Sequence, residues 1–279
     1  ILGPAVNIKR SPLCGRNFEY YSEDPYVASE LAGALIHGVQ SKNVGTSIKH
    51  FLANNQETRR MSGDSRVDER TLNEIYLAAF EGAVKKEKPW TVMCSYNKIN
   101  GVYAAQNQQY LTDTLRDKWG FEGFTLSDFL WAVKDGVKGV KGGMNIEMPC
   151  FCRYIEDIPK ALADGRLEMA DLDEAVGYIL RTIYYYETRK DPQEYGEDIL
   201  ACDRHVQVAK RAAQESMVLL KNEGNVLPFD REKTEKIVVL GVLGDIENIG
   251  DHGSSKVHPY YTVTPFKGLM KKMPRAQIL

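Results

Sequence analysis

The sequence predicts an α/β protein that is built from successive strand and helix segments. Five short apolar runs, which begin near residues 1, 46, 91, 124 and 144, are typical of buried strands. Helical patterns or long loops separate these runs, as in βαβ units. Polar side chains follow several of the runs, and functional groups of α/β folds gather at the carboxyl ends of the strands.

The composition is that of a globular protein with a large core. The chain has 279 residues, of which 43% are hydrophobic, enough for one sizeable domain and part of another. Its 36 Lys and Arg residues nearly balance its 38 Asp and Glu residues, and no basic block would bind a nucleic acid. No apolar run approaches the roughly 20 residues that span a membrane. We expect no nucleic-acid or membrane partner.

The five cysteines are scattered and odd in number, which argues against a disulfide framework. Cys150 and Cys152 are too close together for an ordinary zinc half-site, so we expect reduced thiols and no metal. These thiols and the absence of a visible leader favour a cytoplasmic location.

The first segments contain two strand-like runs with a helix between them. Residues 1–8 form the first run, and a polar stretch that contains Arg16 follows it. A helix is predicted from about residue 26 to 40. Its expected apolar face comprises Val27, Leu31, Ala34, Leu35 and Val39. The strand 46–51 then carries Lys49 and His50 near its carboxyl end, where they suit hydroxyl groups or an anion.

The next segments repeat this rhythm. A helix is predicted within residues 65–87, with acidic residues in its first turn and lysines in its last turn. The strand 91–96 ends in Tyr96, and a further helix covers 107–118.

Asp128 follows the apolar run Phe124-Thr125-Leu126, so we expect it at the mouth of a strand. A helical pattern then continues through Ala132, Val133, Val137 and Val140, and a strand is predicted at 144–148. The alternative interpretation of Asp128 is an ordinary helix N-cap.

About 190 residues precede a change in composition, and a closed (β/α)₈ barrel needs eight strands. The first part of the chain is therefore a five-stranded open sheet or an incomplete barrel. Two helices are predicted at about 155–163 and 171–187. The polar residues up to 204 form a linker. From His205 a long helix is predicted through Leu220 to residues 221–224, and then a strand at 236–242 and a short helix.

Several motifs in order resemble glycoside hydrolase family 3, the β-glucosidase family. They are CGRNFEYYSEDP, SIKHFLANNQETRR, VDERTLNEIYLAAF, VMCSYNKINGVYAAQN, GFTLSDFLWAV, GMNIEMP and AAQESMVLLKNEGNVLPF. The resemblance implies a TIM-like (β/α)₈ barrel that is incomplete at its start, followed by the beginning of an α/β sandwich domain. The expected domains are residues 1–190, a linker at 191–204, and residues 205–279.

The resemblance also implies a retaining exo-β-glycosidase that removes terminal β-D-glucosyl units. Asp128 matches the family's nucleophile. The residues that match its sugar-binding positions are Arg16, Lys49, His50, Met93, Tyr96 and Phe129, with Met93 and Phe129 as pocket walls. We expect Arg16 and Lys49 to keep Asp128 ionised, because nearby positive charge lowers the pKa of a carboxyl group. The mechanism requires no metal or organic cofactor.

The family's usual acid/base glutamate lies in a part of the second domain that this sequence does not match, so no residue is assigned to that role. Glu147 is interpreted as a structural residue, and Glu57 as a residue that orients Lys49 or Arg60. Within the family, β-xylosidase and α-L-arabinofuranosidase are the alternatives. A lyase or aldolase with a Schiff base on Lys49, and a sugar-binding fragment without catalytic activity, are the rivals from other classes.

Overall fold

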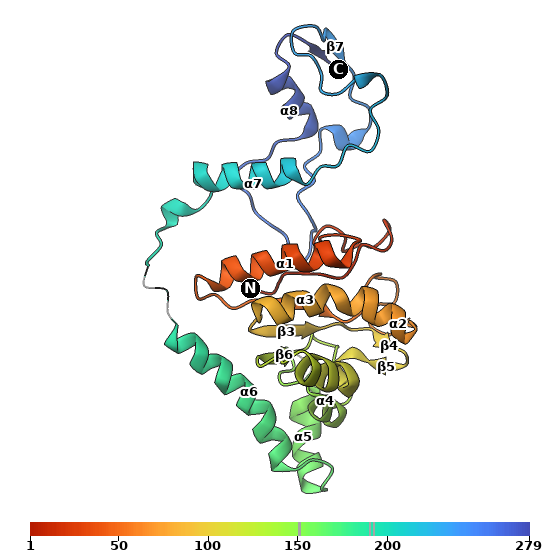
Figure 1. Cartoon of the computed structure of the whole chain (residues 1–279), viewed down its shortest axis with the longest axis vertical. Helices are drawn as coiled ribbons and strands as arrows, with labels where there is room; N and C mark the ends of the chain where they lie inside the picture. The colour runs from red at the N-terminus through yellow and green to blue at the C-terminus, as the bar shows by residue number, and fades with distance from the viewer. Residues whose placement is uncertain (150–151, 190, 192) are drawn as a thin grey trace. The chain divides into compact units, whose positions relative to one another are not determined.

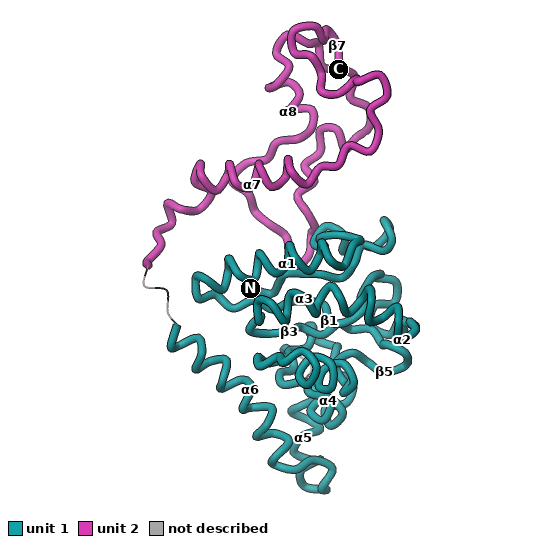
Figure 2. The backbone as a smooth tube through the Cα atoms, in the orientation of Figure 1, with its two compact units in different colours: residues 1–192 teal, residues 193–279 magenta. Residues whose placement is uncertain are grey.

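A computed structural model describes residues 1–149, 152–189, 191 and 193–279. The chain divides into two compact units, residues 1–192 and residues 193–279 (Figures 1 and 2). Unit 1 contains the three-stranded parallel sheet and most of the buried side chains.

The strands of unit 1 lie side by side in the order of the chain. The sheet consists of β1 (Ser47–Phe51), β3 (Thr91–Cys94) and β6 (Phe124–Leu126), which pair in parallel in that order. Ala5 pairs in parallel with β1 on one side, and Ile146 pairs in parallel with β6 on the other. Sequential parallel order without a reversal is the order of a barrel, whereas doubly wound sheets reverse their strand order. The incomplete barrel is therefore the correct alternative.

Helices follow the strands and cover the sheet (Figure 1). The longer helices of unit 1 are α1 (Pro25–Gln40), α3 (Ala78–Glu87), η3 (Gln109–Lys118), α4 (Gly136–Gly142), α5 (Arg153–Ala163) and α6 (Met169–Thr188). Shorter segments are α2 (Glu69–Thr71), the π-helical η1 (Leu72–Leu77), which connects α2 to α3, and the 3₁₀ turn η2 (Ala104–Gln106). A small second sheet contains β2 (Asp64–Ser65), β4 (Lys98–Ile99) and β5 (Val102–Tyr103).

Helix α1 begins where the sequence predicts, but it buries a different face. The Asp24 side chain accepts hydrogen bonds from two backbone N–H groups of the first turn, and Pro25 is favourable there. The buried face carries small residues such as Ala28 and Ala32, whereas Val27, Leu31 and Leu35 are 40–48% exposed. The predicted apolar face was wrong because α1 packs close to α3. A Cβ atom on Gly82 of α3 would come within 2.3 Å of Ser29 Oγ.

The core of unit 1 lies between the sheet and its helices. Phe51 of β1 contacts Phe80 of α3 edge to face, with 5.2 Å between ring centroids. It also contacts Trp119 at 6.0 Å. Because such aromatic contacts add to the burial of apolar surface, they fix α3 and the end of η3 against β1.

The segment after Asp128 is a turn, which corrects the predicted helix. Leu130 has a φ of 69°, a left-handed conformation that a helix cannot continue. Asp135 provides the N-cap of α4, because its side chain accepts a hydrogen bond from Lys138 N. Ala132 and Val133 are buried in the core before this helix begins. Asp128 is therefore not a helix cap, and its carboxylate is free for another role.

The fifth strand is also shorter than the sequence predicts. Of residues 144–148, only Ile146 pairs with a strand, through backbone hydrogen bonds with Thr125 and Ser127. Glu147 accepts a hydrogen bond from Tyr154 N at 2.8 Å, which agrees with its structural interpretation.

Unit 2 contains two helices and one strand pair, with short turns at η4 (Glu197–Ile199), η5 (Glu223–Asn225) and η6 (Val242–Gly244). Helix α7 (Asp203–Glu215) is shorter than predicted and ends before Leu219 and Leu220. Strand β7 is limited to Lys236–Ile237, which pairs in parallel with β8 (Gln277–Ile278), and α8 covers Pro265–Lys272. Residues 217–220 are 60–92% exposed, and without burial of its apolar residues a helix gains little stability from packing.

Four cysteines, Cys14, Cys94, Cys152 and Cys202, are free thiols, and Cys150 lies outside the described residues. In the described part of the chain, no helix has both the length and the apolar character that a bilayer crossing requires.

Candidate active site

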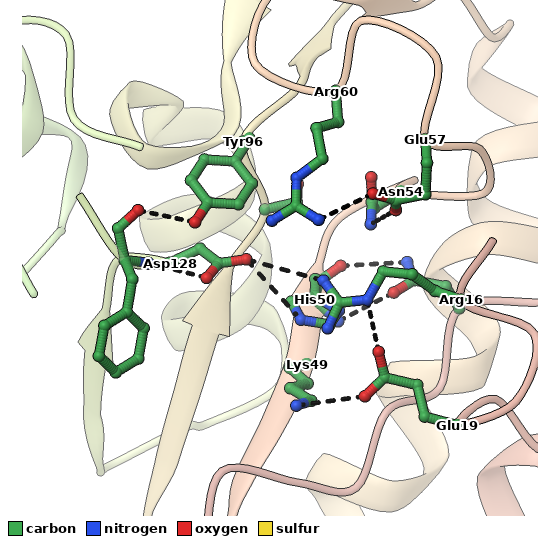
Figure 3. Close-up of polar contacts among 12 residues, drawn as sticks. Arg16, Glu19, Lys49, His50, Asn54, Glu57, Arg60, Tyr96 and Asp128 are labelled. Carbon is green, nitrogen blue, oxygen red and sulfur yellow. Dashed lines mark hydrogen bonds and ion pairs between the residues drawn. The ribbon is translucent and has the colours of Figure 1, made fainter. Parts of the chain in front are cut away.

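The predicted site residues lie at the carboxyl ends of the parallel strands (Figure 3). Lys49 and His50 belong to β1, and Tyr96 and Asp128 each come two residues after β3 and β6 respectively. Arg16 reaches the same place from the loop that follows Ala5. Because parallel strands present their carboxyl ends on one face of the barrel, residues far apart in the sequence meet there.

Asp128 is the buried acidic group at the centre of this cluster. The residue is 7% exposed, and its Oδ1 accepts a hydrogen bond from Phe129 N at 2.7 Å. Its Oδ2 lies 4.0 Å from Arg16 Nη1 and 3.8 Å from His50 Nε2, and accepts no hydrogen bond within the described residues. One carboxylate oxygen is thus anchored, and the other is buried without a hydrogen-bond partner.

Burial raises the pKa of the Asp128 carboxyl above its ordinary value, and this effect exceeds the opposing ones. The Phe129 N–H group, Arg16, Tyr96 and Arg60 all favour the charged carboxylate. The expected effect of Arg16, which lowers the pKa of Asp128, is confirmed, but burial outweighs it. Lys49 was assigned to the wrong partner, since its Nζ lies 3.3 Å from Glu19 Oε2.

His50 is held as a neutral side chain. It is 1% exposed, and burial together with the cations Arg16, Lys49 and Arg60 keeps its pKa well below the ordinary value. Its backbone is fixed by Asn7, which donates a hydrogen bond to His50 O at 3.0 Å and accepts one from His50 N at 2.9 Å. At 3.8 Å from Asp128, its Nε2 is beyond direct hydrogen-bond distance.

Tyr96 connects Asp128 to the backbone that follows it. Its hydroxyl donates a hydrogen bond to Phe129 O at 2.7 Å. Burial and the nearby Asp128 charge raise the pKa of Tyr96 to about 12, so the phenol stays protonated at neutral pH. The Arg60 guanidinium lies over the ring, 4.7 Å from its centroid. This cation–π contact fixes the ring beside Asp128.

Four residues around this centre, Glu19, Asn54, Glu57 and Arg60, are absent from the sequence-based assignment of site residues. Glu19 pairs with both Arg16 and Lys49. Arg60 donates to Glu57 Oε2 at 2.9 Å, and Asn54 donates to Glu57 Oε1 at 3.1 Å. Of the two roles proposed for Glu57, orientation of Arg60 is the correct one. The signal was a carboxylate and an arginine three residues apart in both GRNFE and ETRR.

Met93 and Phe129 differ strongly in exposure, and their role as pocket walls stays a prediction. Met93 on β3 is 2% exposed, whereas Phe129 is 36% exposed. No group of three or more His, Cys, Asp or Glu side chains among the described residues is arranged to hold a metal ion.

A parallel barrel with a buried carboxylate among cations at the carboxyl ends of its strands has the architecture of a barrel enzyme's active site. Comparison with known proteins specifies the family. Residues 1–182 match the glycosyl hydrolase family 3 N-terminal domain, and residues 217–277 match its C-terminal domain. The chain belongs to glycosyl hydrolase family 3, and its fold class of a partial barrel followed by the start of a sandwich domain is confirmed.

Two curated relatives illustrate the similarity. Thermostable beta-glucosidase B of Acetivibrio thermocellus is 49% identical over 93% of this chain, and an exo-alpha-(1->6)-L-arabinopyranosidase of Bifidobacterium breve is 46% identical over 93%. The chain spans 34% of the length of each of these relatives.

Solved structures give the same result. A beta-glucosidase of Bifidobacterium adolescentis matches all of this chain with a TM-score of 0.85 and 43% identity, over 40% of its own length. Beta-glucosidase 3B of Thermotoga neapolitana in complex with glucose matches 99% of this chain with a TM-score of 0.86 and 43% identity, over 39% of its own length.

Proposed function

We propose that the protein is a retaining exo-β-glucosidase that hydrolyses terminal β-D-glucosyl residues through a glycosyl-enzyme intermediate on Asp128. The observation that carries this proposal is the free Oδ2 of a buried carboxylate beside Arg16 and His50. The names of three relatives, the beta-glucosidases at 43–49% identity, support glucose as the sugar.

The geometry supports Asp128 as the nucleophile. Its Oδ1 is held by Phe129 N, so the other oxygen can approach an anomeric carbon without reorientation of the carboxylate. Arg16, Tyr96 and Arg60 favour the ionised form that attack requires. Attack breaks the bond to the leaving oxygen and forms a covalent bond to Asp128, and water later hydrolyses this bond.

A second carboxyl group must protonate the leaving oxygen. Three carboxylates in unit 1 lie near the site or its strand ends, and each already has a partner. Glu19 pairs with two cations, Glu57 pairs with Arg60, and Glu147 accepts a hydrogen bond from Tyr154 N. Because each of these carboxylates is already held by such a partner, we assign the acid to none of the three residues.

A second candidate is an exo-α-L-arabinopyranosidase, which the 46% identity to the Bifidobacterium breve protein supports. The aldolase alternative is less well supported, because a Schiff-base lysine needs an uncharged amine and Lys49 is ion-paired with Glu19 at 3.3 Å.

The test is active-site trapping with 2-deoxy-2-fluoro-β-D-glucosyl fluoride, followed by peptide mass mapping. The fluoride leaving group needs little acid assistance, so the reagent reports on the nucleophile. We expect an adduct on Asp128. An adduct on another residue would contradict the assignment, and turnover of the α-L-arabinopyranoside but not of the β-D-glucoside would favour the second candidate.

A further inference from the structure

Glu19 binds two cations that come from different parts of the chain (Figure 3). Its Oε1 accepts a hydrogen bond from Arg16 Nε, and its Oε2 lies 3.3 Å from Lys49 Nζ. The three side chains are only 13–15% exposed. Arg16 belongs to the loop that leads to α1, whereas Lys49 belongs to β1. One carboxylate therefore links a loop to the rigid sheet at the mouth of the barrel.

We propose that Glu19 is a positioning residue, which sets the separation of Arg16 and Lys49 and thereby determines which sugar hydroxyls the site can bind. This inference rests on the proposed function. Two like charges this close to one another would otherwise repel and move apart into solvent. Because Glu19 uses only Nε of Arg16 and one donor of Lys49, the remaining N–H groups of both cations are available to a ligand.

The arrangement suits a polyhydroxylated ring. Charge-assisted donors bind hydroxyl oxygens more strongly than neutral donors, and fixed donors give specificity. Arg16 Nη1 already points toward Asp128 at 4.0 Å, so the ring that reacts with Asp128 would lie next to the Arg16 and Lys49 donors. The bridge by Glu19 keeps these donors in place before the sugar arrives, which reduces the ordering cost of binding.

Glu19 also balances the charge of the cluster. Arg16, Lys49 and Arg60 are the cations, Glu19, Glu57 and Asp128 are the carboxylates, and His50 is neutral. The groups that face Asp128 from the packed elements are Arg16, His50, Arg60, Tyr96 and Cys94. Loss of the Glu19 charge leaves this environment more positive, which favours the ionised Asp128. The acid limb of the pH profile should then move to lower pH.

Two variants of Glu19 separate the effect of its side-chain length from the effect of its charge, and a third variant is a control. Glu19→Gln removes the charge, and Glu19→Asp keeps the charge but is one methylene too short to reach both cations. Glu57→Gln is the matched control, because Glu57 pairs with Arg60, which lies over Tyr96, and forms no ion pair with Arg16 or Lys49 within the described residues. Thermal unfolding of each variant checks that it folds.

The experiment measures kcat/KM on an aryl β-D-glucoside and on its 3-, 4- and 6-deoxy analogues, from pH 4 to 9. In the wild type, removal of a hydroxyl that Arg16 or Lys49 binds should lower kcat/KM by about 10-fold or more. In both Glu19 variants this penalty should fall to about 2-fold or less, whereas Glu57→Gln should retain it. The acid limb should move to lower pH in Glu19→Gln and stay in place in Glu19→Asp.

If removal of a hydroxyl group lowers kcat/KM in both Glu19 variants as much as in the wild type, the proposal is wrong. If the wild type prefers the α-L-arabinopyranoside, the glucose assignment fails while the same comparison on arabinosyl substrates still tests Glu19. If no glycoside is hydrolysed, calorimetric titration with glucose replaces turnover. If Glu19→Gln binds glucose about 10-fold more weakly than the wild type, the positioning role is supported. If the two proteins bind glucose equally, or if the wild type does not bind it, the proposal is overturned.

Discussion

The contact between Arg16 and Asp128 gives a prediction whose sign follows from the charges. Arg16 Nη1 lies 4.0 Å from Asp128 Oδ2, and the two side chains are 15% and 10% exposed. At an effective dielectric constant of about 20, two unit charges at this distance interact by about 4 kcal/mol. Loss of the arginine charge in Arg16→Met therefore removes up to about 4 kcal/mol of support for the ionised nucleophile.

We expect kcat/KM of Arg16→Met at pH 7 to fall by about 10-fold to 1,000-fold, since each 1.36 kcal/mol corresponds to a factor of ten. Burial already raises the pKa of Asp128 and Arg16 opposes this effect, so the variant's acid limb should move to higher pH. Initial rates on an aryl β-D-glucoside between pH 4 and 9 measure this, because kcat/KM reports the ionisations of the free enzyme.

Arg16→Lys provides the matched control, since it keeps a positive charge but loses the planar guanidinium. Its acid limb should stay close to that of the wild type even where its affinity for substrate falls. An acid limb of Arg16→Met that stays in place or moves to lower pH would refute the electrostatic argument. A lower kcat/KM without any movement of the limb would assign Arg16 to substrate binding alone.

Three further substitutions test the site and the core. Asp128→Asn should lower kcat/KM by at least about 10⁴-fold. Because burial raises the pKa of Asp128, the ionised carboxylate destabilises the folded protein above that pKa, so Asp128→Asn should also raise the melting temperature at pH 7.5. This gain should vanish below about pH 3.9. A lower melting temperature of the variant at pH 7.5 would contradict this reasoning. Tyr96→Phe loses the 2.7 Å hydrogen bond to Phe129 O, so urea unfolding should show a free energy of unfolding lower by about 1 kcal/mol. Initial rates should show a kcat/KM that is about tenfold lower. Wild-type values of both quantities would argue against this contact. Leu111 is 0% exposed, so Leu111→Ala should lower the free energy of unfolding in urea by about 2–5 kcal/mol. Leu13 is 93% exposed, and the control Leu13→Ala should change this free energy by less than about 0.5 kcal/mol. Similar losses in both variants would contradict the core assignment.

The sequence determined where the strands lie along the chain and which polar residues follow them. Apolar runs of strand length and the breaks between them are local signals, so Lys49, His50, Tyr96 and Asp128 could be assigned to strand ends without a structure. The family motifs are likewise local strings. For this reason the fold class and the placement of these residues near strand ends followed from the sequence.

Only the tertiary structure decided which groups pair and which face is buried. Lys49 contacts Glu19 rather than Asp128, because the loop before α1 returns to β1. The pKa of Asp128 is raised because burial outweighs the cations, and burial depends on elements far apart in the sequence. Helix α1 buries its alanines because α3 approaches closely at Gly82. Pairing, desolvation and close packing are properties of distances between segments, and a linear pattern does not contain those distances.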